Sequence, residues 1–198
     1  ATLTVRVTAP EALLVAASGQ RSAPTSPSAG LRTHAFTVER PVPPFLFAFA
    51  VGDFEETLLE ADGVRLRGLG PRGVPLTAAL STTAAALRFL HERTGLAYPD
   101  AEYQQVFVAG DAAQESAGLA LLSASALDDL KADPGDDWIF SHELAHQWFA
   151  FLLPCADFSD FWLNEGFASF LTAALKEARW GAGAYERELS LFRQRSAK

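Results

Sequence analysis

The stretch from Ser141 to Leu175 constrains this chain most, because it combines two histidines at helical spacing with nearby glutamates. His142 and His146 are four residues apart, so on a helix they lie one turn above each other and can direct two imidazoles at one point. Glu143 completes the pattern H-E-x-x-H. A catalytic Zn²⁺ takes three protein ligands and keeps a fourth position for water. The histidines therefore predict two of the three ligands of a site for one zinc ion.

Glu165 is the expected third ligand. Residues 147–164 are enough for the first helix to end, for the chain to turn near Pro154, and for a second helix to return antiparallel. Glu143, which lies beside a ligand, is then expected to act as general base toward the zinc-activated water. The alternative is a chance H-E-x-x-H with histidines packed in a core. The agreement of two histidines, two glutamates and flanking aromatic residues argues against it.

At these residues the chain resembles the aminopeptidase N (alanyl aminopeptidase) family of gluzincin zinc metallopeptidases, whose third ligand is a glutamate on the next helix. The matching segments are HELAHQWF and WLNEGFASF. Upstream, AAQESAGL at residues 112–119 is similar to the family's G-A-M-E-N-x-G-L segment. The resemblance implies that Glu115 binds the free α-amino group of a peptide substrate. Three neighbours depart from the pattern: Ala112, Gln114 and Ser116 replace Gly, Met and Asn.

Composition excludes several classes of protein. With 198 residues, 49% of them hydrophobic, and 15 Phe, the chain should bury a sizeable core. The net charge of −8 argues against nucleic acid and anionic membranes as partners. No uncharged apolar stretch is long enough to span a bilayer. The single Cys155 excludes an internal disulfide framework and permits a reducing compartment. We expect a cytoplasmic protein, with secretion as the alternative.

The first third of the chain is expected to be all β. Residues 2–8 and 32–38 alternate in hydropathy and should pair antiparallel, while residues 19–30 are expected to form an exposed loop. Residues 45–51, FLFAFAV, are typical of a continuous buried strand. Residues 55–69 should form a hairpin around Asp62-Gly63. His34, in a strand, and His91, near a helix end, are interpreted as ordinary structural histidines.

The remainder should mix helices and strands. A helix is expected over residues 76–93 with Gly95 as its stop, followed by strands at residues 104–109 and 119–122, with Glu115 in a loop between them. The three remaining predicted helices cover residues 138–153, 161–179 and 185–195. A strand at the sheet edge near Glu115 would let an extended peptide add its backbone to the sheet.

The fold class predicted is α+β, divided at Gly70-Pro71. Residues 1–70 would form the C-terminal part of a β-rich domain, and residues 71–198 the first part of a thermolysin-like zinc peptidase domain, as the resemblance implies. The family also carries a tyrosine that donates to the tetrahedral oxyanion, and none of Tyr98, Tyr103 or Tyr185 matches it. We therefore expect a middle segment of a longer aminopeptidase, with the remainder of the catalytic domain missing and activity weak in isolation.

Three functions fit these observations. The leading one is a zinc aminopeptidase that hydrolyses the first bond of peptides with a free N-terminus, using Glu143 as base and Glu115 as the ammonium-binding group. The second is a thermolysin-like zinc endopeptidase, which would cleave peptides with blocked N-termini. The third is a non-catalytic interaction module derived from such enzymes, and the presence of all three ligands together with Glu143 argues against it.

Overall fold

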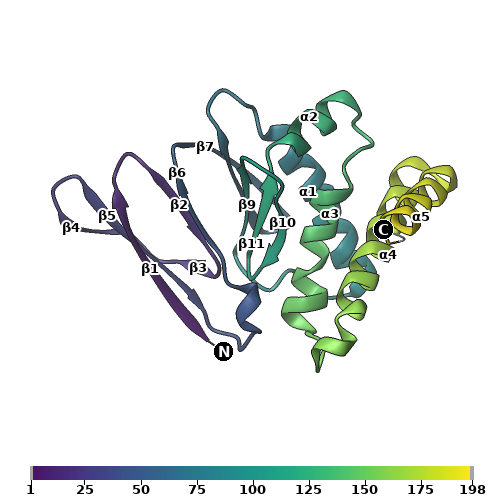
Figure 1. Cartoon of the computed structure of the whole chain (residues 1–198), viewed down its shortest axis with the longest axis horizontal. Helices are drawn as coiled ribbons and strands as arrows, with labels where there is room; N and C mark the ends of the chain where they lie inside the picture. Colours follow the sequence, from purple (N-terminus) through teal and green to yellow (C-terminus); the bar gives the residue numbers. More distant parts are fainter. Residues whose placement is uncertain (1, 197–198) are drawn as a thin grey trace.

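The chain folds in the α+β class that the sequence predicts, as a computed structural model describing residues 2–196. Residue 1 and residues 197–198, the outer ends of the two expected domains, lie outside the described residues. Figure 1 shows a small N-terminal β layer, then a five-stranded sheet, then helices on the far side of that sheet. The candidate site residues come from the second sheet and from the helices beside it.

The N-terminal sheet is built around β1 (Leu3–Pro10) and β5 (Leu31–Val38), which pair antiparallel as predicted. The expected loop at residues 19–30 is wrong in part, because it contains β3 (Gln20–Arg21) and β4 (Thr25–Ser28), both paired with β5. Folding back onto β5 gives the backbone of this polar segment hydrogen-bond partners that the side-chain pattern does not reveal.

A second pair of strands joins β2 (Leu14–Ala17) to β6 (Phe49–Gly52). The predicted strand over residues 45–51 is wrong in its first half, which forms a 3₁₀ turn at Pro44–Leu46. Proline has no N–H and a fixed φ, so the Pro-rich entry favours a turn over a ladder. As a result Phe45 and Phe49 are 38% and 60% exposed.

The hairpin of β7 (Phe54–Ala61) and β8 (Val64–Pro71) is confirmed, with Asp62 and Gly63 both at positive φ as a two-residue primed turn requires. It belongs to the five-stranded sheet, whose order is β10-β11-β9-β8-β7. The hairpin is thus hydrogen-bonded to strands on the far side of the expected boundary at residue 70. The two-domain division stays a prediction, and the pairing favours a boundary before β7.

Helix α1 (Thr77–Thr94) links β8 to the parallel strand β9 (Glu102–Val108), and it ends at Gly95 with φ 69° as predicted. Strands β10 (Ala113–Ser116) and β11 (Leu119–Ser123) complete the sheet, with β10 at its edge. The main core lies between this sheet and the helices. Its largest fully buried members are Trp148, Tyr103, Phe107, Phe140, Leu66, Leu76, Leu80 and Leu87.

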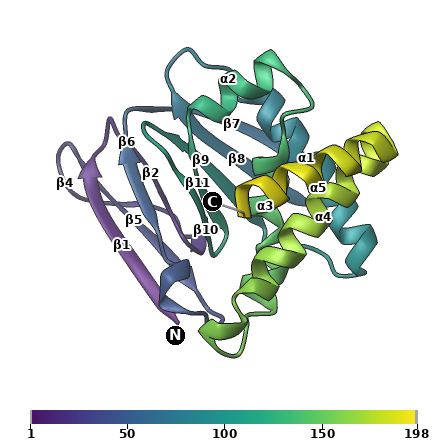
Figure 2. The same cartoon turned by 45° about the vertical axis from the view of Figure 1, so that its right-hand side comes forward.

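The C-terminal half contains α2 (Ser125–Ala132), α3 (Trp138–Ala145), α4 (Trp162–Trp180) and α5 (Ala182–Ser196). Sequence analysis did not assign α2. Figure 2 shows α5 lying against α4. No helix within residues 2–196 combines the length and apolarity needed to cross a bilayer.

The predicted helix over residues 138–153 is wrong beyond His146. α3 ends at Ala145, and a π-helical segment, Gln147–Leu152, follows with non-helical dihedral angles at Phe149 and Ala150. The break lets Trp148 pack in the main core while Phe151 packs in a second cluster with Val38, Val42, Leu46 and Ala117. Burial of both aromatic side chains accounts for the loss of regular helix.

Candidate metal centre

The two histidines of the H-E-x-x-H pattern face each other at the end of α3. His142 lies in its last turn and His146 follows its last residue, and their Nε2 atoms are 3.3 Å apart. Both are buried, at 8% and 2% exposure. The His142 ring packs edge-on against Trp138, with ring centroids 5.7 Å apart. The helix thus presents two fixed imidazole nitrogens at one point.

Glu165 reaches the same point from the first turn of α4. Its Oε2 lies 3.3 Å from His142 Nε2, and its Oε1 lies 3.5 Å from His146 Nε2. The buried small residues Ala168 and Ala173 lie on the same helix, which packs against α3. One ligand atom from each of the three side chains lies within 4.8 Å of the others, a spacing at which one ion can contact all three.

The hydrogen bonding of His146 leaves its Nε2 free for a cation. His146 Nδ1 lies 3.4 Å from the carbonyl oxygen of Phe149, to which it can donate. That bond would fix the tautomer with Nε2 unprotonated, the arrangement common among metal-ligating histidines. The π-helical break supplies this carbonyl, because it turns Phe149 out of the helical geometry.

Two further carboxylates border the histidines. One ligand atom each of Glu115, Glu143 and His146 lies within 4.8 Å of the others, and Glu143 is 4% exposed. Glu143 Oε2 has no hydrogen-bond partner in the described part of the chain. Glu115, expected in a loop, lies instead in β10, opposite Ala120 of β11, at the edge of the sheet. It is buried to 8% exposure.

Burial dominates the electrostatics of the site. It raises the pKa of Glu143 well above its ordinary value, and the charges of Glu115 and Glu165 add to the rise. Burial likewise raises the pKa of Glu115. Burial lowers the pKa of His146 to about 4, and the neighbouring His142 adds to that effect. Three carboxylates and two imidazoles gathered at one point form a donor set that fits Zn²⁺, whose positive charge would offset the repulsion among the carboxylates.

Glu165 behaves differently from the other two carboxylates. Burial raises its pKa, but the hydrogen bond with His142 and the interaction with His146 outweigh that effect, so the pKa is lowered. Its side chain is also 44% exposed, which separates it from the buried pair. Glu165 is therefore the carboxylate that stays ionised most readily, as a metal ligand must.

Two glutamines that sequence analysis did not assign to the site contact the strand carrying Glu115. Gln114 lies beside it in β10, and Gln147 directly follows His146. Both positions lie inside the quoted motif segments, so adjacency to a candidate residue was the only available sequence signal. Their contacts appear only in three dimensions, because Gln147 reaches across to residues 116–118.

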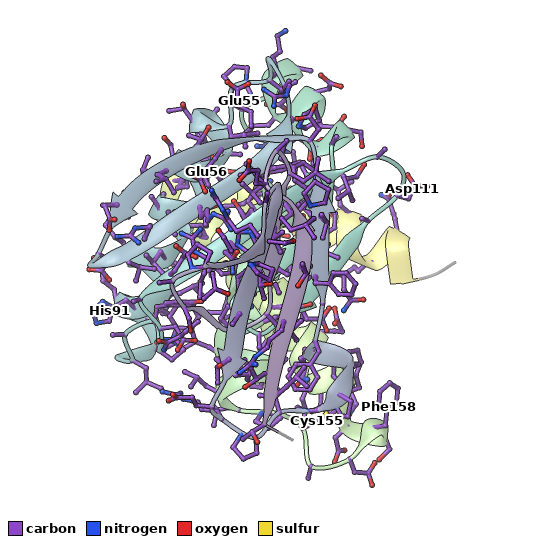
Figure 3. All side chains as sticks on the ribbon, turned by 90° about the vertical axis from the view of Figure 1, so that its left-hand side faces the viewer. Glu55, Glu56, His91, Asp111, Cys155 and Phe158 are labelled. Atoms are coloured by element: carbon purple, nitrogen blue, oxygen red, sulfur yellow. The ribbon has the colours of Figure 1, made fainter. Side chains whose placement is uncertain are left out.

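The other two histidines lie apart from this centre. His34 is buried in β5, and His91 pairs with Asp62 across 2.6 Å. Figure 3 places His91 well away from Cys155 and Phe158, which lie together near one end of the molecule. Tyr98 and Tyr103 are buried in the main core, and burial raises the pKa of each well above its ordinary value.

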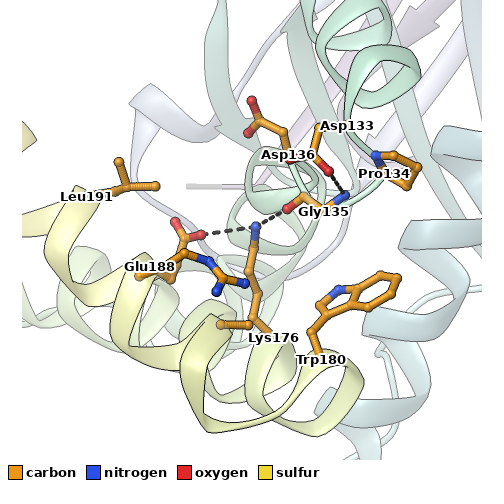
Figure 4. Close-up of a pocket in the computed structure, with 10 residues that line it drawn as sticks. Asp133, Pro134, Gly135, Asp136, Lys176, Trp180, Glu188 and Leu191 are labelled. Carbon is orange, nitrogen blue, oxygen red and sulfur yellow. Dashed lines mark hydrogen bonds and ion pairs between the residues drawn. The ribbon is translucent and has the colours of Figure 1, made fainter.

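A pocket of about 750 Å³ lies elsewhere, between α4, α5 and the turn before α3 (Figure 4). Lys176 projects into this region, and its Nζ lies 2.5 Å from the carbonyl oxygen of Gly135 and 3.0 Å from Glu188 Oε2. Asp137, which precedes α3, also pairs with Lys176 at 3.1 Å. The Lys176 ammonium is thus engaged in joining α4 to α5 and to the start of the helix with the histidines.

Comparison with known families identifies the group to which the site belongs. The family described as "Peptidase family M1 domain" matches residues 78–197, which include every candidate site residue. The chain belongs to peptidase family M1. The resemblance seen in the sequence is thereby confirmed.

Relatives of this M1 chain include leucine aminopeptidase 2 of Emericella nidulans, 27% identical over 180 residues covering 86% of this chain. Mouse (Mus musculus) aminopeptidase N is 32% identical over 155 residues covering 69% of this chain. The M1 chain spans 28% of the length of the fungal relative and 16% of the mouse one.

Solved structures agree with the fold. The M1 zinc metallopeptidase from Deinococcus radiodurans is 33% identical and superposes with a TM-score of 0.74, covering 90% of this chain and 40% of that enzyme. A mutant form of the Deinococcus enzyme bound to a Tyr-Ser-Ala substrate is 32% identical, with a TM-score of 0.78 over 98% of this chain and 44% of that one. The M1 chain therefore has the architecture of part of a family M1 enzyme.

Proposed function

We propose that this chain carries the metal-binding and substrate-amine-binding parts of a zinc aminopeptidase. The observation that carries the proposal is the convergence of His142, His146 and Glu165, with Glu115 and Glu143 bordering the same imidazoles. The names of the aminopeptidase relatives and of the Deinococcus zinc enzyme support it. His142, His146 and Glu165 would hold one Zn²⁺ per chain.

In the proposed hydrolysis, the metal and Glu143 have separate roles. When bound, Zn²⁺ would supply Lewis-acid chemistry, polarising a carbonyl and lowering the pKa of water towards about 7. Glu143 would take a proton from the attacking water and return it to the leaving amine. The raised pKa of its buried carboxyl suits both steps, because a base with a pKa nearer the working pH can also act as the acid.

Glu115 would select the end of the substrate. Its buried carboxylate beside His146 and Glu143 favours a positively charged partner, and the α-ammonium of a peptide is such a group. β10 is an edge strand, so the backbone of an extended peptide can pair with its free side. A peptide held in this way would present its first bond to the metal.

The Glu115 carboxylate also argues against the alternative of an endopeptidase. A blocked N-terminus would leave Glu115 buried without a counter-charge, which costs more binding free energy than pairing it. This favours an aminopeptidase over an endopeptidase. Tyr98 is buried and donates to the carbonyl oxygen of Glu102, so we do not assign it as an oxyanion donor.

A binding experiment tests the proposal without requiring complete catalysis. Zinc-loaded protein is titrated calorimetrically with L-leucinamide and with N-acetyl-L-leucinamide, and chelator-treated protein serves as the control. We expect the free amine to bind at least about tenfold more tightly, because a charge-paired hydrogen bond contributes roughly 1.5–3 kcal/mol. Equal affinities would reject an aminopeptidase site, and zinc failing to bind would reject the metal centre.

A further inference from the structure

The side chain of Gln147 joins the histidine segment to the strand that carries Glu115. Its Nε2 donates to the carbonyl oxygen of Ser116, and its Oε1 accepts from the N–H of Gly118, both at 2.9 Å. The residue is 1% exposed. Each end of the buried amide is thus satisfied by the turn between β10 and β11, and by groups next to Glu115.

The two hydrogen bonds of Gln147 help to fix the register of the edge strand β10. β10 has four residues and pairs on one side only, with Ala113 opposite Leu122 and Ser116 opposite Leu119. A slip of one residue would turn every side chain of such a strand to the opposite face. Gln147 opposes a slip, because its two bonds tie the end of β10 to the residue after His146.

A second glutamine holds the carboxylate itself. Gln114 Nε2 lies 2.9 Å from Glu115 Oε2 and 2.9 Å from the Glu115 carbonyl oxygen. Within residues 2–196 it is the one side-chain amide that donates to this carboxylate. Unlike Gln147, it is exposed. A bond to both backbone and carboxylate of the same residue restricts the rotamer that the carboxylate adopts.

We infer that Gln147 and Gln114 are positioning residues for recognition of the substrate amine. Gln147 fixes the strand of Glu115 against His146, and Gln114 fixes the direction of the Glu115 carboxylate. This inference rests on the proposed function. It adds that free-amine selection depends on two neutral side chains outside the metal ligands and outside the proton-transferring carboxylate.

A purely structural role predicts a different result. If the buried glutamine served only to pack the core, replacing it would lower the stability of the whole fold and reduce the affinity for every ligand alike. A positioning role lowers affinity for the free amine and leaves the N-acetylated ligand and the metal unaffected. The ratio of the two affinities therefore separates the roles.

The test compares Gln147→Met and Gln114→Leu with matched controls on zinc-loaded protein. Gln105→Met is the buried control, since Gln105 is fully buried and its Oε1 accepts from Thr83 of α1. Gln20→Leu is the exposed control, since Gln20 bonds Asp100. Affinities for L-leucinamide and N-acetyl-L-leucinamide are measured by calorimetry, zinc affinity by competition with a chelator, and folding by circular dichroism.

We expect both site variants to lose about three- to tenfold in affinity for L-leucinamide, with N-acetyl-L-leucinamide, zinc and both controls unchanged. If Gln147→Met does not fold, Gln114→Leu decides alone. A folded Gln114→Leu protein that keeps the wild-type affinity ratio overturns the inference and leaves the proposed function standing. Wild-type protein without preference for the free amine overturns both.

Discussion

Glu165 Oε2 lies 3.3 Å from His142 Nε2, although the two residues belong to different helices. The contact closes a triangle with His146 and depends on the packing of α4 against α3. Two imidazoles and a carboxylate at this separation are the arrangement expected of ligands to one cation, and burial lowers the pKa of His146 to about 4, so that it is neutral near pH 7 as a ligand must be.

Replacing Glu165 with Gln should weaken zinc binding while the fold persists. The change removes the negative charge of the third ligand, so we expect a loss greater than the roughly 10- to 100-fold that an outer-shell partner contributes. Competition titration against a chelator measures it. Glu177→Gln, on the exposed surface of the same helix, is the matched control. Equal zinc affinity in both variants would remove Glu165 from the ligand set.

Glu143→Gln should abolish turnover and keep the metal. A general base contributes about 10²- to 10⁴-fold to the rate, so the rate of aminoacyl-arylamide hydrolysis should fall by that factor in the variant. Zinc content, measured by mass spectrometry, should stay at the wild-type value. Activity that survives the substitution would assign the base to another residue.

The same substitution should stabilise the metal-free chain. Burial and two neighbouring carboxylates disfavour the ionised form of Glu143, and a neutral amide avoids that cost. Thermal unfolding in the presence of chelator should therefore give a higher Tm for Glu143→Gln than for wild type. A lower Tm would mean that the carboxylate makes a stabilising contact in the metal-free protein.

Lys176→Met should destabilise the fold strongly. The Lys176 ammonium contacts Asp137 and Glu188, and removing it leaves buried carboxylates with less compensation. We expect a loss of about 3 kcal/mol in urea unfolding. Arg72→Met, which breaks the exposed pair with Asp53, should leave the free energy of unfolding nearly unchanged. Similar costs for the two variants would show that the buried network contributes no more than a surface pair.

His34 should make the protein sensitive to acid. Burial lowers its pKa, and the charges of Arg32, Arg21 and Arg67 add to the effect. The unfolded state then binds more protons than the folded state below about pH 6.5, so stability falls as the pH drops through that range. His34→Gln should flatten the decline in unfolding free energy as the pH falls below about 6.5, the ordinary histidine pKa. Parallel curves for the two proteins would contradict this.

The sequence predicted the parts of the fold whose signals are local. The turn at Asp62-Gly63, the helix stop at Gly95 and the helical spacing of His142 and His146 each depend on a few adjacent residues. The spacing after His146 allowed Glu165 to be chosen as well, and the likeness to a known motif allowed Glu115. Their roles stay predictions, but their placement beside the histidines is what those roles require.

The parts that sequence analysis missed depend on pairing and packing between segments. Residues 20–28 pair with β5 because their backbone needs partners, and the chain breaks after His146 because Trp148 and Phe151 enter different cores. Gln147, the first residue of the π-helical segment, contacts Ser116 and Gly118. Hydropathy patterns record none of these relationships, since each depends on a second segment as well as on the residues of the first.

The central claim is that His142, His146 and Glu165 hold one zinc ion, and a crystal of zinc-soaked protein measured on both sides of the zinc absorption edge tests it most directly. We predict one anomalous peak per chain, with both Nε2 atoms and a Glu165 carboxylate oxygen at about 2.0–2.2 Å. A peak bound by other residues, or full zinc loading with the Glu165 carboxylate turned away from the ion, would contradict the account.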